Sequence, residues 1–115
     1  MNDMMQRFLL FAFLLLMTVR TSMSQDILVP MDDTQSDHLK AYGLTFWALE
    51  RQIDVDWLLN YRGGSFLFVR EPEIESELRI RGVSYEVISG SRTAAIISEV
   101  ESDAANTSMV RLEKP

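Results

Sequence analysis

The chain has 115 residues, of which 47% are hydrophobic and 24% charged, a balance typical of one folded domain and not of a disordered segment. Its net charge of −6 excludes a strongly basic surface, so we expect no nucleic-acid partner. Because cysteine is absent, disulfides, thiolate metal ligands and a cysteine nucleophile are excluded within these residues.

Residues 1–24 have the pattern of a cleavable signal peptide. Arg7 precedes an unbroken apolar run, Phe8 to Met17, which at about 10 residues is half of the roughly 20 needed to cross a bilayer. Ser22 and Ser24 are the small residues that signal peptidase requires before the cut, so Gln25 is the predicted mature N-terminus. An uncleaved anchor and a buried core helix are the alternatives. We expect a secreted or periplasmic protein with no stable membrane insertion after cleavage.

The mature chain, residues 25–115, begins with a short apolar strand, Ile27 to Pro30, followed by a polar loop to Asp37. Thr34 or Ser36 is the expected cap of a helix that runs to about Arg51. One face of this helix is predicted to be buried on the basis of helical spacing: Leu39, Tyr42, Gly43, Phe46, Trp47, Leu49 and Ile53. Trp47 and Trp57 are both expected in the core.

Two strands, Val55–Leu59 and Phe66–Val69, are predicted on either side of a turn that contains Gly63 and Gly64. A helix is then predicted to start at Pro72, because the amide hydrogen that proline lacks has no partner at the start of a helix. It is predicted to stop at Gly82, because glycine commonly follows the last residue of a helix. The remaining predicted elements are a strand over 83–88, a helix over 93–102, a loop over 103–108 and the start of a strand at 109–112.

This order of strands and helices predicts an α/β fold with a small, mostly parallel or mixed sheet flanked by helices. The last predicted strand would leave an open sheet edge near Pro115, which natural domains avoid. We therefore expect the domain to be incomplete, the N-terminal segment of a longer protein.

The turn between the paired strands carries the main candidate site. Ligands of open α/β sheets bind beyond the carboxyl ends of strands, and paired glycines let backbone amides approach an anion. Arg62 could hold a carboxylate or phosphate through two hydrogen bonds. A small polar or anionic ligand is thus predicted at Asn60, Arg62, Gly63, Gly64 and Ser65. The alternative is a tight connection between strands with a solvated arginine.

A second polar group follows the first strand and contains Asp32, Asp33, Gln35 and His38. Carboxylates beside an imidazole could bind a divalent metal or transfer protons, although such residues are more often caps and loop polar groups. We expect Asp32 and His38 to contribute to the ligand site, and we predict no metal, no cofactor and no catalytic residue in this chain. Asn106-Thr107-Ser108 matches the acceptor pattern for glycosylation.

Long motifs resemble the N-terminal part of a family found in Bacteroidetes and usually labelled "asparagine synthetase B". The resemblance covers nearly all of residues 26–115 and is carried by four segments: Ile27 to Asp32, Gln35 to Gly43, Asp56 to Phe66 and Arg79 to Ile88. Members are several times longer and also begin with a signal peptide. The resemblance implies that a further α/β region, similar to class I glutamine amidotransferases, follows Pro115.

The label itself does not fit the chemistry of these residues. Glutamine-dependent asparagine synthetases use an N-terminal cysteine and a Ser-Gly-Gly-x-Asp-Ser type loop, and Gly63-Gly64-Ser65 lacks the first serine and the aspartate of that loop. We expect a ligand-binding or scaffold segment without chemistry of its own. Two alternatives remain open: part of an amidotransferase-like or hydrolase enzyme whose catalytic residues lie beyond Pro115, and a stand-alone envelope interaction domain.

Overall fold

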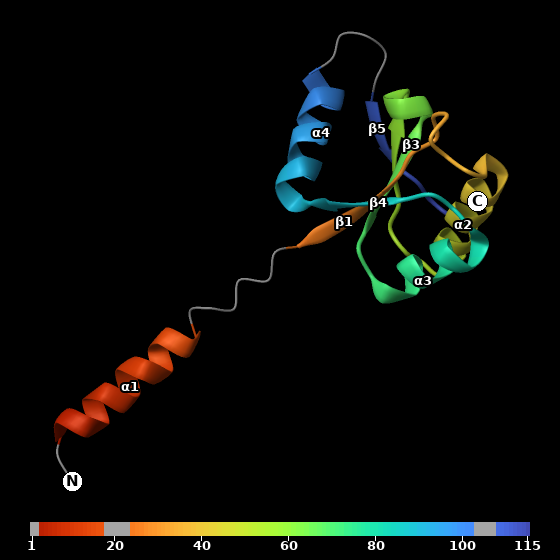
Figure 1. Ribbon diagram of the computed structural model, residues 1–115. Helices are drawn as coiled ribbons and strands as arrows, with labels where there is room; N and C mark the ends of the chain where they lie inside the picture. Colours follow the sequence, from red (N-terminus) through yellow and green to blue (C-terminus); the bar gives the residue numbers. More distant parts are fainter. Residues whose placement is uncertain (1–2, 18–23, 103–107) are drawn as a thin grey trace.

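The computed structural model describes residues 3–17, 24–102 and 108–115. Helix α1 (Asp3–Met17) contains the predicted apolar run and lies apart from the other helices and strands (Figure 1). Within the described residues, no helix has both the length and the apolar character needed to cross a membrane. The predicted cleavage site and the glycosylation pattern fall largely on residues 18–23 and 106–107, outside the described residues, so both stay predictions.

The remaining described residues form strands and helices in the predicted order. They are β1 (Gln25–Val29), α2 (His38–Glu50), β2 (Asp56–Leu59), the short 3-10 helix η1 (Tyr61–Gly63), β3 (Ser65–Val69), α3 (Pro72–Arg81), β4 (Glu86–Ser89), α4 (Gly90–Ser102) and β5 (Ser108–Arg111).

The strands of the described residues form one sheet in the order β4-β1-β3-β2-β5, and every neighbouring pair is antiparallel. The predicted mostly parallel or mixed sheet is therefore wrong, although the fold is a small α/β one. β1 and β2 do run in the same direction, as their connection through α2 requires, but β3 lies between them. In the same way, β3 and β4 run in the same direction, and β1 lies between them. This is the split βαβ arrangement of ferredoxin-like folds, with α4 and β5 added after it.

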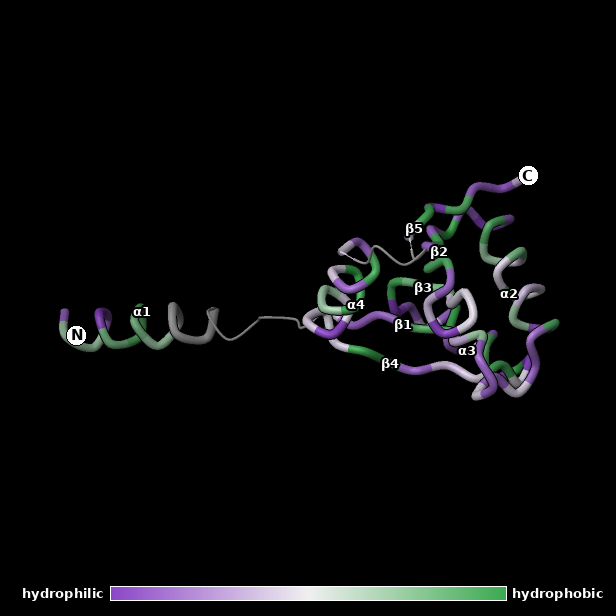
Figure 2. The backbone as a smooth tube through the Cα atoms, turned by 90° about the horizontal axis from the view of Figure 1, so that it is seen from above, coloured by the Kyte–Doolittle hydropathy of each residue, from purple (hydrophilic) through white to green (hydrophobic). Residues whose placement is uncertain are grey.

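Helices cover both faces of the sheet, which explains why the relative direction of its strands was predicted wrongly. Figure 2 shows α4 on one side of the strands and α2 and α3 on the other. Every residue of β1 from Ile27 to Val29 is consequently buried, as are Ser65 to Phe68 of β3. Such continuous apolar runs are usual in parallel sheets, where helices cover both faces, whereas antiparallel strands more often alternate.

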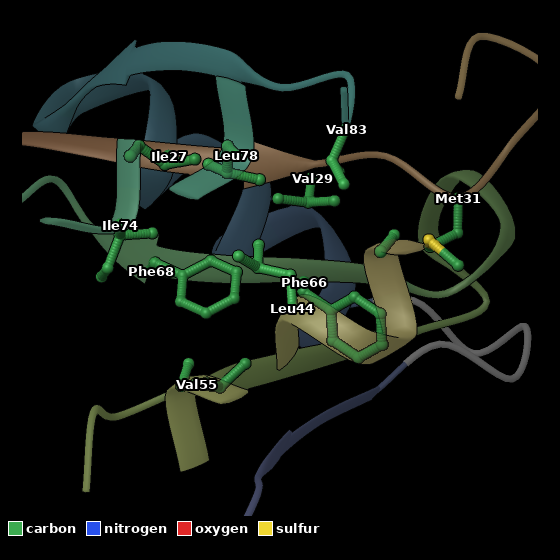
Figure 3. Close-up of a cluster of buried hydrophobic side chains, with 12 residues drawn as sticks. Ile27, Val29, Met31, Leu44, Val55, Phe66, Phe68, Ile74, Leu78 and Val83 are labelled. Carbon is green, nitrogen blue, oxygen red and sulfur yellow. The ribbon is translucent and has the colours of Figure 1, made fainter. Parts of the chain in front are cut away.

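The two faces hold separate cores. Ile27 and Val29 of β1 point toward α2 and α3, where they join Phe66, Phe68, Leu44, Ile74 and Leu78 (Figure 3). Leu28 points to the opposite face and packs with Leu58, Leu67, Ile96 and Val100 beneath α4. Trp47 and Trp57 are partly buried against the first of these cores.

Helix α2 buries a different face from the one predicted. Its buried residues are Ala41, Leu44, Thr45 and Ala48, whereas Leu39, Tyr42 and Phe46 are 81%, 54% and 49% exposed. Small side chains at the contact let a helix lie close to its neighbours, and the larger residues then occupy the edges of the contact. The N-cap is Asp37, whose carboxylate accepts from Lys40 N at 3.0 Å, in place of the predicted Thr34 or Ser36. Helix α3 does begin at Pro72 and end at Gly82, where φ is 71°.

Candidate functional site

Two loops at one end of the sheet bring together most of the predicted site residues. One loop follows β1, and the other joins β2 to β3. Met31 N donates to Arg62 O at 3.1 Å, which connects the two loops directly. His38 Nε2 lies 3.1 Å from Met31 O and 3.0 Å from Asp32 O. Since both of these atoms are carbonyl acceptors, this nitrogen carries a hydrogen and donates it to the loop.

Arg62 is held by acidic residues of this chain. Its Nε donates to Asp32 Oδ2 at 2.8 Å and its Nη1 to Glu86 Oε2 at 2.5 Å. Its Nη2 donates to Thr34 Oγ1 at 3.0 Å, and this hydroxyl donates in turn to Asp32 Oδ1. The guanidinium therefore joins the β2–β3 loop, the loop after β1 and the start of β4. An anion at this position would compete with two carboxylates for the same donors.

The electrostatics of the pair follow from these hydrogen bonds. The Arg62 guanidinium, followed by the Thr34 hydroxyl, lowers the pKa of Asp32 from 3.8 to about 2. The hydrogen bond to Asp32 also raises the pKa of Arg62. Asp32 is consequently ionised throughout the physiological range and serves as the fixed counter-charge of Arg62.

The glycines and Ser65 have roles in the shape of the loop. A Cβ on Gly63, where φ is +85°, would lie 2.4 Å from Met31 O. Gly64 O accepts from Trp57 Nε1 at 3.0 Å, and the buried Ser65 donates its hydroxyl hydrogen to Tyr61 O at 2.9 Å. Asn60 is exposed at the end of β2, with a left-handed φ of 61°. These contacts fit the tight connection that was the alternative to a ligand site, and ligand binding here stays a prediction.

Gln35 connects the loop after β1 to the segment before β4. Its amide nitrogen donates to Pro30 O at 2.8 Å and to Ser84 O at 2.9 Å, and its Oε1 accepts from Ser84 N at 2.8 Å. Its side chain is thus used in a buried contact between two loops. Among the residues that the structure describes, no three His, Cys, Asp or Glu side chains gather so as to hold a metal ion.

Sequence reasoning missed Glu86 and Ser84 as partners of these loops. Glu86 lies opposite Leu28 in the register of β4 and β1, and the antiparallel pairing of these strands is what brings it to Arg62. No local pattern marks a partner that is 24 residues away, so only the correct sheet topology could have indicated it.

A second candidate is an apolar groove of about 330 Å³ beside α2. It is lined by Tyr42, Thr45, Phe46, Leu49, Trp57, Phe66, Leu112, Glu113 and Pro115. Leu112 N donates to Val55 O at 2.9 Å, which fixes the segment after β5 as one wall. The prediction that Tyr42 and Phe46 belong to the core concealed this groove. One signal was available, because Ala41, Leu44 and Ala48 form a second apolar stripe at helical spacing on the opposite side of the helix.

Two aromatic rings of the groove, those of Trp57 and Tyr42, are in contact with the ring of Phe66. Trp57 stacks on Phe66 with ring centroids 6.2 Å apart and an interplanar angle of 22°. Tyr42 meets Phe66 edge to face at 5.9 Å and 79°. The three rings come from α2, β2 and β3 and form one continuous wall. Such packed aromatic walls with few polar groups are typical of sites that bind small molecules.

Comparison of the chain with models of protein families, with curated proteins and with solved structures finds no match.

Proposed function

We propose that this chain is a ligand-binding domain of an exported protein similar to the family labelled "asparagine synthetase B", and that it binds the apolar part of a small ligand in the groove beside α2. The observation that carries the proposal is the groove itself, whose 330 Å³ lies within the range of about 300–1,000 Å³ found for ligand pockets. We propose export to the cell envelope or to the outside of the cell on the basis of the apolar run from Phe8 to Met17.

In this proposal the two loops around Arg62 have a supporting role. Their hydrogen bonds tie β1, β2 and β4 at one end of the sheet. Trp57 connects this end to the groove, since its indole nitrogen donates to Gly64 O while its ring lines the groove. The Trp57 indole N–H, which makes this bond, is therefore a suitable reporter of ligand binding in the groove.

The experiment uses the protein purified after export from a bacterium that expresses the chain. The protein is titrated with the neutral probe 4-phenylbutan-1-ol and followed by NMR. We expect an affinity of about millimolar, as usual for a ligand of this size. The shifts should be confined to the Trp57 indole and to the amides of Phe46 and Leu112.

Phe46→Gln is the test variant, because it removes a half-exposed ring without creating a buried cavity. It should weaken binding by about fivefold or more, equivalent to about 1 kcal/mol of apolar contact. Ile80→Gln is the matched control, since Ile80 is 75% exposed on α3 and lies outside the groove. Shifts that are absent, or that Phe46→Gln leaves unchanged, would reject the groove as a ligand site.

A further inference from the structure

The charges that line the groove point to the chemistry of its ligand. Among the described residues that line it, Glu113 has the one charged side chain. The other polar side-chain groups of the lining are the hydroxyls of Tyr42 and Thr45 and the indole N–H of Trp57, which donates to Gly64 O. The Thr45 hydroxyl is buried and donates to Ala41 O at 3.0 Å, so it has no hydrogen left to donate to a ligand. The charged side chain of the lining is therefore negative, and it favours a positively charged ligand.

The aromatic wall favours the same charge. The faces of aromatic rings carry negative potential, and organic cations bind against them within about 6 Å. Trp57 and Tyr42 lie along the groove and both contact the buried Phe66, so their rings are the ones that a ligand can reach. The same domain uses this contact elsewhere, because the Arg51 guanidinium lies 4.2 Å from the ring centre of Trp47, outside the groove.

The net charge of the domain acts in the same direction. The whole chain carries −6, and the predicted leader contains Asp3, Arg7 and Arg20, so residues 25–115 carry −7. Such a field raises the local concentration of cations and lowers that of anions.

We propose that the groove selects a small organic cation with an apolar body, the body lying against the rings of Phe46 and Trp57 and the ammonium group beside the Glu113 carboxylate. This inference rests on the proposed function, and it names the class of ligand that the groove takes. It differs from the anionic ligand predicted for residues 60–65, which concerns another part of the surface.

The test uses three probes that share one apolar body: 4-phenylbutylamine, 4-phenylbutan-1-ol and 4-phenylbutyrate. In low salt the amine should bind up to about fivefold more tightly than the alcohol, and the acid more weakly than either, as an exposed charge pair allows. The preference should shrink in 1 M salt, where charges are screened beyond about 3 Å. The NMR signals of Trp57, Phe46 and Leu112 report the binding.

Glu113→Gln separates the two proposals, because it removes the charge and keeps the shape. The amine should then bind no more tightly than the alcohol, while the affinity of the alcohol stays the same. Glu99→Gln, on α4, is the matched control and should leave all three affinities unchanged.

Each other outcome overturns the inference in a distinct way. Equal binding of amine and alcohol to the unmodified chain rejects cation selection and leaves the apolar groove standing. Binding of none of the probes rejects the groove as well. Shifts of the same signals on raising the protein concentration without any probe would assign the groove to a second copy of the chain.

Discussion

Arg62 and Asp32 are 30 residues apart in the chain, and the Nε of one donates to the Oδ2 of the other at 2.8 Å. Asp32 follows β1 and Arg62 lies in the β2–β3 loop, so this bond joins two connections at the same end of the sheet. The Arg62 backbone is left-handed, with φ 45° and ψ 48°, and its carbonyl accepts from Met31 N. The guanidinium and the backbone of one residue thus hold the same loop.

The first prediction concerns acid stability. The folded chain lowers the pKa of Asp32 from 3.8 to about 2, so its ionised form is favoured by folding. The resulting stabilisation is complete above about pH 5 and is lost as the pH falls through 3.8 toward 2. The free energy of unfolding, measured by urea denaturation between pH 5 and pH 2, should fall less steeply for Asp32→Asn than for the unmodified chain.

An NMR titration of the Asp32 carboxyl carbon checks the cause of this effect. In Arg62→Met, which lacks the donor, the pKa of Asp32 should return toward 3.8. Arg92→Met, an exposed arginine of α4, is the control and should leave the pKa of Asp32 low. An Asp32 that titrates near 3.8 in the unmodified chain would contradict the pair.

The second prediction compares two glycines that both have positive φ. At Gly82, φ is +71° and nothing lies within 4 Å of an added Cβ. Gly82→Ala should therefore lower the free energy of unfolding only by the cost of a left-handed backbone conformation for alanine, about 1–2 kcal/mol. At Gly63, φ is +85° and the added Cβ would lie 2.4 Å from Met31 O, so Gly63→Ala should cost about 3 kcal/mol or more. Urea denaturation of both variants measures the difference. Equal losses would mean that the loop after β1 moves away at no cost.

The helices and strands could be predicted from the sequence because the signals that begin and end them are local. Pro72 and Gly82 bound α3, and the glycine-containing turn at 60–64 separates β2 from β3. The direction of the strands could not be predicted in the same way. A buried strand with helices on both faces has the same apolar run whether its neighbours are parallel or antiparallel, and Ile27 to Val29 fit either arrangement.

The candidate site was predicted in its position but not in its contacts. The loops after β1 and β2 do lie together, because these strands point in the same direction even with β3 between them. That Arg62 faces two carboxylates depends on Glu86, which the pairing of β4 with β1 brings into reach. The apolar groove depends on the rotation of α2 about its axis, which a helix with large apolar residues on several sides leaves undetermined.

The third prediction tests that rotation. Leu44 is fully buried and Leu39 is 81% exposed on the same helix, although helical spacing predicts that Leu39 faces the core. Leu44→Ala removes packing against the sheet and leaves a cavity, so it should lower the free energy of unfolding by about 2–5 kcal/mol. Leu39→Ala, the same change at the surface, should alter it by no more than about 0.5 kcal/mol. Urea denaturation of the two variants decides between the faces, and a larger loss for Leu39→Ala would restore the predicted one. In that case Tyr42 and Phe46 would belong to the core, and the groove beside α2 would lose its aromatic wall.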